Sequence, residues 1–540
     1  MNMMRKVSVA VGVLCLLWSS SVLGEAIGWR GDGTGRFANA DPPTEWAKDK
    51  NIVWASKMPA WSNSSPIVVG DRVFVCSEST DLVCCSAANG KILWKKTHEY
   101  FDALSPEELP KAQEMKKQGD EITKQLQSVD AEFNKFNGQL ASLDYLRKKS
   151  DEFPKQIAAL PDQLKAAQAE LEAPSAELQK TPDNADLKKK VEELKKKVDE
   201  LTNNQDSLPK ELAKVAETLT SIGDEAALKQ KVDDLKKQVE ALRAKLAPVS
   251  AYNLPPIHPA TGYSTPTPVS DGRNVYVLAG NGVAACYDLD GNRKWIKIVT
   301  KPTNGWGHSA SPLLFGDKFI YHILAVTALN KETGEELWKT PDTPNVYGTP
   351  VIGKIKGIDA LVTPWGAVVR VSDGKLLAKM GRWLDSGSPI VVDGVVYLMQ
   401  HSGAISFADE PADEFKPLER WTTKLRPNEV YYASPLYDDG IVYAISHQAV
   451  LSTIDSKTGA VIYEKQLDLG RASSVFTSLT LAGKYIYASN ESGVTVVFEP
   501  GREYKQVKRN ELGDGFRSSP LFVGKRMYVR GQNNLYCIGQ

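Results

Sequence analysis

Short apolar runs, separated by polar turns, recur along most of this chain. Each recurrence starts with Ser or Thr, usually followed by Pro, and continues as an apolar run, a turn containing Gly or Asp, and a second apolar run. The starts lie about 40 residues apart, an interval typical of a β-propeller blade made of four short strands. They fall at Ser65, Thr265, Ser311, Thr349, Ser388, Ser434, Ser478 and Ser519.

The first repeat shows how four strands fit one unit. The strands are expected at residues 66–69, 73–76, 82–87 and 91–95. Gly70-Asp71 joins the first two, because Gly supplies the positive φ of a tight hairpin turn. The outer strand carries Trp94, four residues after Gly90, and the same spacing recurs at Trp295, Trp338 and Tyr463. We expect these rings to pack against the neighbouring blade and to stabilise the contact.

The two ends of the pattern predict how the ring closes. The last repeat ends at Ile538 after three strands, with no outer strand left. An apolar strand carrying Trp54, at residues 51–57, precedes the first repeat. If this strand completes the last blade, the sheet has no open edge. The predicted fold is therefore all-β, an eight-bladed propeller with N-to-C strand closure.

A long helical insertion is expected between blades 1 and 2. Trp and Cys are absent from residues 95–264, and apolar residues there alternate four and three apart between charged flanks. Two such runs are Leu187, Val191, Leu194, Val198 and Leu201, and Leu228, Val232, Leu235, Val239, Leu242 and Leu246. This heptad spacing predicts a coiled coil, within one chain or between two. Helix-poor residues 173–184 predict two antiparallel arms meeting there, and Pro154, Pro161 and Pro209 are expected to kink or divide them.

The N-terminal sequence predicts an export signal. Arg5-Lys6 precedes an apolar stretch at residues 7–18, and small residues end at Gly24. The expected domains are a signal peptide at 1–24, the closing strand and blade 1 at 25–100, the coiled-coil hairpin at 101–249, and blades 2–8 at 250–540. The mature protein is expected to be periplasmic or secreted after cleavage near Gly24. Cys15 follows Leu14, so the lipid-attachment box of a bacterial lipoprotein is not formed; a retained anchor is the alternative. No later segment is apolar enough to span a membrane.

Several motifs resemble the repeat of pyrroloquinoline-quinone-type (PQQ-like) propellers. The stretch at residues 329–338, Leu-Asn-Lys-Glu-Thr-Gly-Glu-Glu-Leu-Trp, looks like that repeat, together with the Ser/Thr-Pro and Gly-Asp elements. Residues 29–33, 51–54 and Trp61 resemble the opening of envelope members of the family. The resemblance covers residues 27–100 and 250–540 and implies the fold. It leaves activity open, because the family includes quinoprotein dehydrogenases and non-catalytic scaffolds such as the lipoprotein BamB.

Charge and cysteine usage narrow the functions further. Lys plus Arg and Asp plus Glu both number 66, so nothing favours nucleic acid as a partner. Five cysteines remain after cleavage, at Cys76, Cys84, Cys85, Cys286 and Cys537. Their strand positions favour buried structural thiols, and neighbours on a strand point to opposite faces. The alternative, implied by the resemblance to quinoprotein dehydrogenases, is a vicinal Cys84-Cys85 disulfide above a cofactor.

Residues just ahead of each Ser/Thr-Pro are the candidates to face the central funnel. They are Trp61, Asn63, Tyr263, His308, Tyr347, Asp385, Tyr432, Phe476 and Arg517. The aromatic ones either stack a flat ligand or pack the channel wall. The resemblance implies that a dehydrogenase needs Ca²⁺ on carboxylate and amide oxygens, a carboxylate base, and cations for the quinone's acids. Only Asp385 and Arg517 are charged, so this constellation is incomplete, and no catalytic or metal-binding residue is assigned.

The sequence thus favours an exported, non-catalytic scaffold for protein–protein interaction in the cell envelope. No cofactor, nucleic acid partner or transmembrane span is expected. The coiled-coil arm would bind an envelope protein or form a homo-oligomer. The alternative is a dehydrogenase of alcohols or sugars that uses pyrroloquinoline quinone with calcium.

Overall fold

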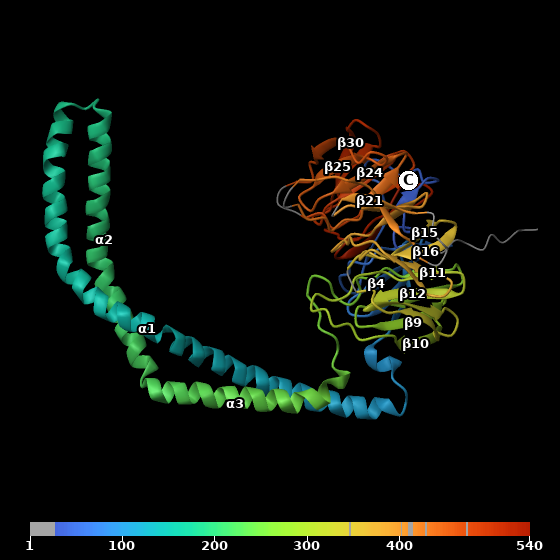
Figure 1. The fold of residues 1–540 in the computed structure, drawn as a ribbon, viewed down its shortest axis with the longest axis horizontal. Coiled ribbons are helices and arrows are strands. Elements are labelled where there is room, and N and C mark those ends of the chain that lie inside the picture. The colour runs from blue at the N-terminus through green and yellow to red at the C-terminus, as the bar shows by residue number, and fades with distance from the viewer. Residues whose placement is uncertain are drawn as a thin grey trace, which may run out of the picture. The chain divides into compact units, whose positions relative to one another are not determined.

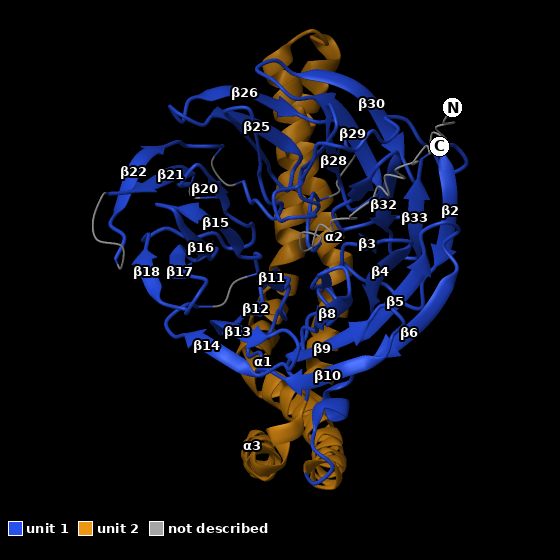
Figure 2. Ribbon diagram, turned by 90° about the vertical axis from the view of Figure 1, so that its right-hand side faces the viewer, with its two compact units in different colours: residues 1–107, 254–540 blue, residues 108–253 orange. Residues whose placement is uncertain are grey.

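The chain forms two compact units in the computed structural model (Figures 1 and 2). One unit is formed by residues 1–107 and 254–540, and the other by residues 108–253. The structure describes residues 27–344, 347–400, 402–408, 414–426, 429–470 and 474–539. The expected signal peptide, with Cys15 and Gly24, lies outside these residues.

The first unit consists of eight sheets with strands in sequential antiparallel order. Blade 1 contains β3 (Ile67–Val69), β4 (Arg72–Ser77), β5 (Asp81–Ser86) and β6 (Ile92–Thr97). Blade 2 contains β7 (Val269–Ser270), β8 (Asn274–Leu278), β9 (Val283–Asp288) and β10 (Arg293–Ile298). Blade 3 contains β11 (Leu313–Phe315), β12 (Lys318–Ile323), β13 (Ala325–Asn330) and β14 (Glu336–Thr340). Blade 4 contains β15 (Val351–Ile355), β16 (Ile358–Val362), β17 (Ala367–Arg370) and β18 (Leu376–Lys379).

The remaining blades repeat this order. Blade 5 contains β19 (Ile390–Val392), β20 (Val395–Leu398), β21 (Gly403–Phe407) and β22 (Pro417–Thr422). Blade 6 contains β23 (Leu436–Asp438), β24 (Ile441–Ile445), β25 (Val450–Asp455) and β26 (Val461–Gln466). Blade 7 contains β27 (Thr480–Ala482), β28 (Tyr485–Ser489), β29 (Val494–Glu499) and β30 (Lys505–Glu511), with β1 (Arg36–Phe37) added in parallel to β27. Blade 8 contains β31 (Leu521–Val523), β32 (Arg526–Arg530), β33 (Asn534–Ile538) and β2 (Ile52–Lys57).

The eight sheets stand as propeller-like blades around an axis, with β6, β10, β14, β18, β22, β26, β30 and β2 at the rim (Figure 2). The predicted number of blades is confirmed. The class is mixed rather than all-β, because three helices make up most of the insertion. The parallel strand β1 was not expected, since two residues carry no readable alternation.

The seam between the two chain ends lies in blade 8. Strand β2 pairs antiparallel with β33, so that Trp54 lies opposite Cys537. The Trp54 indole N–H donates a hydrogen bond of 3.1 Å to the carbonyl of Ala87 in blade 1. Its ring covers Gly90, where a β-carbon would lie 2.5 Å from the indole. Strands β2 and β33, from opposite ends of the described chain, therefore complete one sheet, and Trp54 docks that sheet on blade 1.

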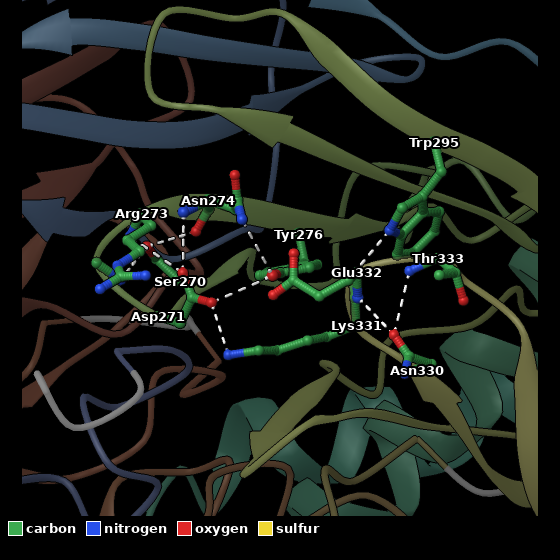
Figure 3. Close-up of polar contacts among 11 residues, drawn as sticks. Ser270, Asp271, Arg273, Asn274, Tyr276, Trp295, Asn330, Lys331, Glu332 and Thr333 are labelled. Atoms are coloured by element: carbon green, nitrogen blue, oxygen red, sulfur yellow. Dashed lines mark hydrogen bonds and ion pairs between the residues drawn. The ribbon is translucent and has the colours of Figure 1, made fainter.

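The same docking recurs between other blades, and Figure 3 shows it between blades 2 and 3. The Trp295 indole N–H donates to the carbonyl of Lys331 at 2.8 Å, and the Lys331 ammonium pairs with Asp271 at 2.8 Å. Asp271 also accepts the Tyr276 hydroxyl at 3.2 Å. The expectation that these aromatic rings pack against the neighbouring blade is confirmed here, because Gly334 lies directly under Trp295.

The second unit is helical. It contains α1 (Glu108–Lys180), α2 (Ala185–Ile222), α3 (Glu225–Val249) and the short η2 (Ser250–Tyr252), while η1 (Tyr100–Ala103) belongs to the first unit. Helix α1 packs against both α2 and α3. The side chains of Asn184 and Asp224 accept backbone N–H groups at the starts of α2 and α3.

The insertion differs from the prediction in how its return arm is divided. The prolines expected to kink or divide the two arms, Pro154, Pro161 and Pro209, lie inside α1 and α2 and end neither helix. The break falls instead at Gly223, whose φ is +74°, followed by the Asp224 cap. Proline inside a helix removes one backbone hydrogen bond, but α1 and α2 continue through it. Glycine at a positive φ ends a helix readily. No helix within the described ranges is both long and apolar enough to cross a bilayer.

The axial cavity as candidate functional site

A cavity of about 530 Å³ lies where the first strands of the eight blades converge. Its wall contains the starting Ser or Thr of every blade, together with residues of the loops that lead into them. The lining consists of Trp29, Asn63, Ser65, Ala260, Thr261, Thr265, Thr267, Trp306, Ser309, Ser311, Tyr347, Gly348, Thr349, Ser386, Ser388, Tyr432, Ser434, Phe476, Ser478, Arg517 and Ser519.

Eight hydroxyl groups in this wall form a closed circle of hydrogen bonds, which we call the hydroxyl ring. Each residue's backbone N–H donates to the hydroxyl oxygen of the corresponding residue in the next blade, at 3.0 to 3.1 Å. The members, in order, are Ser65, Thr267, Ser311, Thr349, Ser388, Ser434, Ser478 and Ser519, and the Ser519 N–H returns to Ser65. All eight are buried. The Ser/Thr of the repeat therefore joins each blade to the next.

The ring corrects one part of the repeat assignment. In blade 2 the member is Thr267, followed by Pro268, and not Thr265 as the spacing suggested. The Thr265 hydroxyl instead donates to the carbonyl of Thr261. The sequence Thr-Pro-Thr-Pro holds two equivalent dipeptides, so the pattern alone could not choose between them.

The ring also leaves hydrogen-bond donors facing the cavity. Every ring hydroxyl accepts an N–H, and among the described residues none of the eight donates its own hydrogen to a protein acceptor. A hydroxyl has one donor hydrogen besides its acceptor lone pairs. These hydrogens can therefore bond to water or to a ligand.

One end of the cavity is covered by the segment that contains Trp29. On one side Ile27 exchanges backbone hydrogen bonds with Ser270 of blade 2, at 2.9 and 2.8 Å. On the other side the Arg30 guanidinium donates to the carbonyls of Pro435 and Leu479, in blades 6 and 7, at 3.0 and 2.7 Å. Blades 2 and 6 stand opposite each other in a ring of eight, so Trp29 lies between them, near the axis. Burial lowers the pKa of Arg30 to about 9.

The other end, which we call the mouth, carries a stack of three side chains. The rings of Tyr432 and Phe476 stack with centroids 5.0 Å apart, and the Arg517 guanidinium lies 4.8 Å from the Phe476 centroid. Arg517 also donates to the carboxylate of Glu491, at 3.0 and 3.1 Å, and to the carbonyl of Ala260. Arg517 is the one charged residue of the described lining, and Glu491 balances its charge.

A second aromatic feature stands beside this stack. The Trp306 ring stacks on His258 with centroids 4.0 Å apart, yet 58% of Trp306 is exposed. Tyr347 shares a hydrogen bond of 2.9 Å with the side chain of Asn304 on the same loop as Trp306. The cavity wall thus alternates hydroxyl groups with flat aromatic faces.

The structure brings five of the nine predicted funnel residues together. Asn63, Tyr347, Tyr432 and Arg517 line the cavity, and so does Phe476. Trp29 and Trp306 line it as well, although the sequence did not single them out as site residues. Trp29 lies before the first repeat and Trp306 several residues before its Ser-Pro, so neither occupies the position that the repeat marks.

Four predicted funnel residues are absent from the lining. Tyr263 is buried and donates its hydroxyl to the carbonyl of Pro255 at 2.6 Å. His308 is buried, with its Nε2 atom 3.0 Å from the carbonyl of Ala310. Asp385 is exposed and bonds to the side chain of Gln400. Trp61 packs beside Gly262. These four residues lie three or four positions before a member of the hydroxyl ring, whereas the candidates that line the cavity all lie two positions before one.

Residues 44–108, 258–354 and 325–539 match the family model described as "Outer membrane protein assembly factor BamB". The chain belongs to this PQQ-like propeller family. The resemblance inferred from the repeat is confirmed. No curated protein matches the chain.

Among solved structures similar to this PQQ-like propeller is BamB from Moraxella catarrhalis, with 15% identity and a TM-score of 0.38 over 50% of this chain and 80% of that one. The quinohemoprotein alcohol dehydrogenase ADHIIG from Pseudomonas putida HK5 has 9% identity and a TM-score of 0.43 over 93% of this chain and 78% of that one.

The residues of the cavity do not fit pyrroloquinoline quinone and calcium. Ca²⁺ takes six to eight oxygen ligands, carboxylates prominent among them, and the described lining of this PQQ-like propeller contains no carboxylate. The quinone's acidic groups call for cations, and Arg517 is already paired with Glu491. Within the described ranges, no group of three or more His, Cys, Asp or Glu side chains is placed to hold a metal ion.

The adjacent cysteines follow the strand rather than a cofactor. Cys84 and Cys85 both lie in β5 as free, buried thiols. Cys84 packs in the core shared with blade 2, together with Val275, whereas Cys85 packs in the core shared with blade 8, together with Leu535. Burial raises the pKa of each thiol to about 12, so both are held in the unreactive protonated form.

Proposed function

We propose that this member of the PQQ-like propeller family is an exported, non-catalytic scaffold that binds other proteins in the cell envelope. One observation carries the proposal: the axial cavity is lined by hydroxyl groups and aromatic rings, with its single charged residue already neutralised. General acid–base catalysis needs a titratable group within reach of the substrate. The described wall contains no Asp, Glu, His, Lys or Cys side chain.

The helical unit supplies the second part of the proposal, a partner-binding coiled-coil arm. Leu228, Val232, Leu235 and Val239 recur at heptad spacing and are 5 to 7% exposed. Charged pairs flank this seam, such as Arg147 with Glu225 at 2.6 Å. The seam buries one face of each helix and leaves charged faces on the outside, which is the usual arrangement of a coiled coil. Those outer faces are available to an envelope protein or to a second copy of this chain.

Removal of the arm tests this role. A variant in which a short Gly-Ser linker replaces residues 108–253 should keep the β-sheet circular dichroism of the parent. If the arm binds envelope proteins, the variant should no longer cross-link to the proteins that cross-link to the parent. If the arm forms oligomers, light scattering should show a smaller assembly than that of the parent. A matched control keeps the arm and replaces one exposed side chain of the outer strand of blade 5, Leu418→Ala, and it should keep the parent's partners and oligomeric state. A variant that folds and retains every partner and the same oligomeric state would contradict the arm's role.

Two further measurements test the other parts. Residues 1–24 fused to a reporter that is active only outside the cytoplasm should give activity, as expected of an export signal. The whole protein, incubated with pyrroloquinoline quinone and Ca²⁺, should show neither a bound chromophore nor dye reduction with alcohols or sugars. Bound quinone with turnover would establish the dehydrogenase alternative instead.

A further inference from the structure

We propose that the mouth of the axial cavity binds a neutral oligosaccharide. This site goes beyond the scaffold role and does not depend on the helical arm. Three properties of the described residues carry the proposal: exposed flat aromatic faces, unused hydrogen-bonding atoms of both kinds, and the balanced charge of the wall.

The first property is the exposure of large aromatic side chains at the mouth. Trp306 is 58% exposed and Tyr432 is 38% exposed, and both line the cavity. Tryptophan is strongly buried on average in folded proteins, so exposed rings gathered at a cavity indicate a binding surface. The C–H face of a sugar ring is apolar and flat, and it packs well on an aromatic face.

A second aromatic pair extends this surface outside the cavity. Trp365 and Trp383 stack with centroids 5.8 Å apart, and they are 41% and 42% exposed. Pro364, adjacent to Trp365, would lie 2.9 Å from a β-carbon on the cavity-lining Gly348. The pair therefore lies beside the mouth, where it can support sugar units that continue out of the cavity.

The second property is a set of unused donors and an unused acceptor. The eight hydroxyl groups of the hydroxyl ring accept hydrogen bonds but, among the described residues, donate none to a protein atom. In the same wall the Asn63 side-chain oxygen is buried without a hydrogen-bond partner, while its amide nitrogen donates to the carbonyl of Ala260 at 2.9 Å. A buried polar atom without a partner is costly, so a ligand or water should satisfy it. Sugar hydroxyls are donors and acceptors at once, and so match both kinds of group.

The third property is charge. Arg517 and Glu491 neutralise each other at the mouth, and no other charged side chain belongs to the described lining. An anionic ligand would have to displace Glu491 from Arg517, and a cationic ligand would find no lining carboxylate. A volume of about 530 Å³ falls within the usual range of small-ligand sites. These features favour a neutral ligand with many hydroxyl groups.

The experiment titrates the whole protein with five neutral hexasaccharides: cello-, malto-, xylo-, manno- and N-acetylchitohexaose. Isothermal calorimetry and tryptophan fluorescence report binding. At least one should bind with a Kd below about 1 mM. Trp306→Ala should weaken that binding roughly fivefold, and Trp306→Phe should restore most of it, because one stacked ring is worth about 1 kcal/mol.

Leu337→Ala is the matched control. Leu337 is 44% exposed on the outer strand of blade 3 and does not belong to the described lining of the cavity, so its loss should leave the affinity unchanged. Thermal unfolding of each variant verifies that it folds. The proposal is wrong if none of the five sugars binds, if Trp306→Ala and Leu337→Ala behave alike, or if only charged polysaccharides such as heparin bind.

Discussion

Replacing Ser388 by alanine removes one link of the hydroxyl ring and tests its contribution to stability. The Ser388 hydroxyl accepts the backbone N–H of Thr349 at 3.0 Å, and Ser388 is 1% exposed. In Ser388→Ala that buried N–H has no protein acceptor. Leaving a buried donor unsatisfied costs about 1 to 3 kcal/mol. The ring borders the cavity, so a water molecule can reach the amide, and we expect a loss near the lower limit, about 1 kcal/mol.

Two measurements read out this loss. Guanidinium unfolding followed by tryptophan fluorescence gives the change in the free energy of unfolding. Hydrogen exchange gives the local effect, because the amide of Thr349 loses its acceptor directly. A loss of 1 to 3 kcal/mol corresponds to exchange roughly 5 to 150 times faster at that amide.

Ser386→Ala is the matched control for this experiment. Ser386 lines the same cavity two residues away, but it is no member of the hydroxyl ring. Its replacement should change the free energy of unfolding by less than about 0.5 kcal/mol. If the two variants unfold alike and the Thr349 amide exchanges at the parent rate in both, the ring does not hold the blades together.

Three further predictions follow from the blade contacts. Trp54→Ala should lower the free energy of unfolding by about 3 to 5 kcal/mol, measured in urea, because it empties the seam of blade 8. Gly459→Ala should destabilise more than Gly381→Ala in thermal unfolding: both glycines have positive φ, but only at Gly459 would the β-carbon meet Trp421, at 2.6 Å. Burial lowers the pKa of His322 to about 4, so the unfolded chain binds a proton that the folded chain excludes, and stability should fall as pH drops from about 6.5 to 4. His322→Asn should make that fall in melting temperature shallower, and an equal slope in both proteins would refute the assignment.

The blades could be predicted because each one repeats the same local chemistry. Ser/Thr-Pro, the Gly turn and the Gly-x-x-x-Trp spacing satisfy requirements that lie within one blade or at its nearest neighbour. The role of the Ser/Thr hydroxyl could not be foreseen, because its partner is an amide some 40 residues away that only the closed circle brings near. For the same reason Thr267 could not be distinguished from Thr265.

The cavity was harder to predict than the ring around it. Asn63 and Arg517, each two residues before a serine of the hydroxyl ring, line the cavity, whereas Asp385, three residues before Ser388, bonds to Gln400. Every residue two positions before a ring member lines the cavity, but the sequence pattern does not distinguish this position from its neighbours in the same loop. Trp29 was missed because the segment that covers the channel follows no repeat at all.

The pairing of β2 with β33 makes completion of blade 8 depend on two segments that are far apart in the chain. A chain that ends before Asn534 would lack β33. Strand β2 (Ile52–Lys57) would then have no hydrogen-bonded neighbour, and blade 8 would expose unpaired backbone groups at two strand edges. Such edges recruit other strands, so premature termination should yield aggregates rather than a smaller propeller. Blade 8 is therefore a complete sheet only when the segments of β2 and β33 are both present in one molecule.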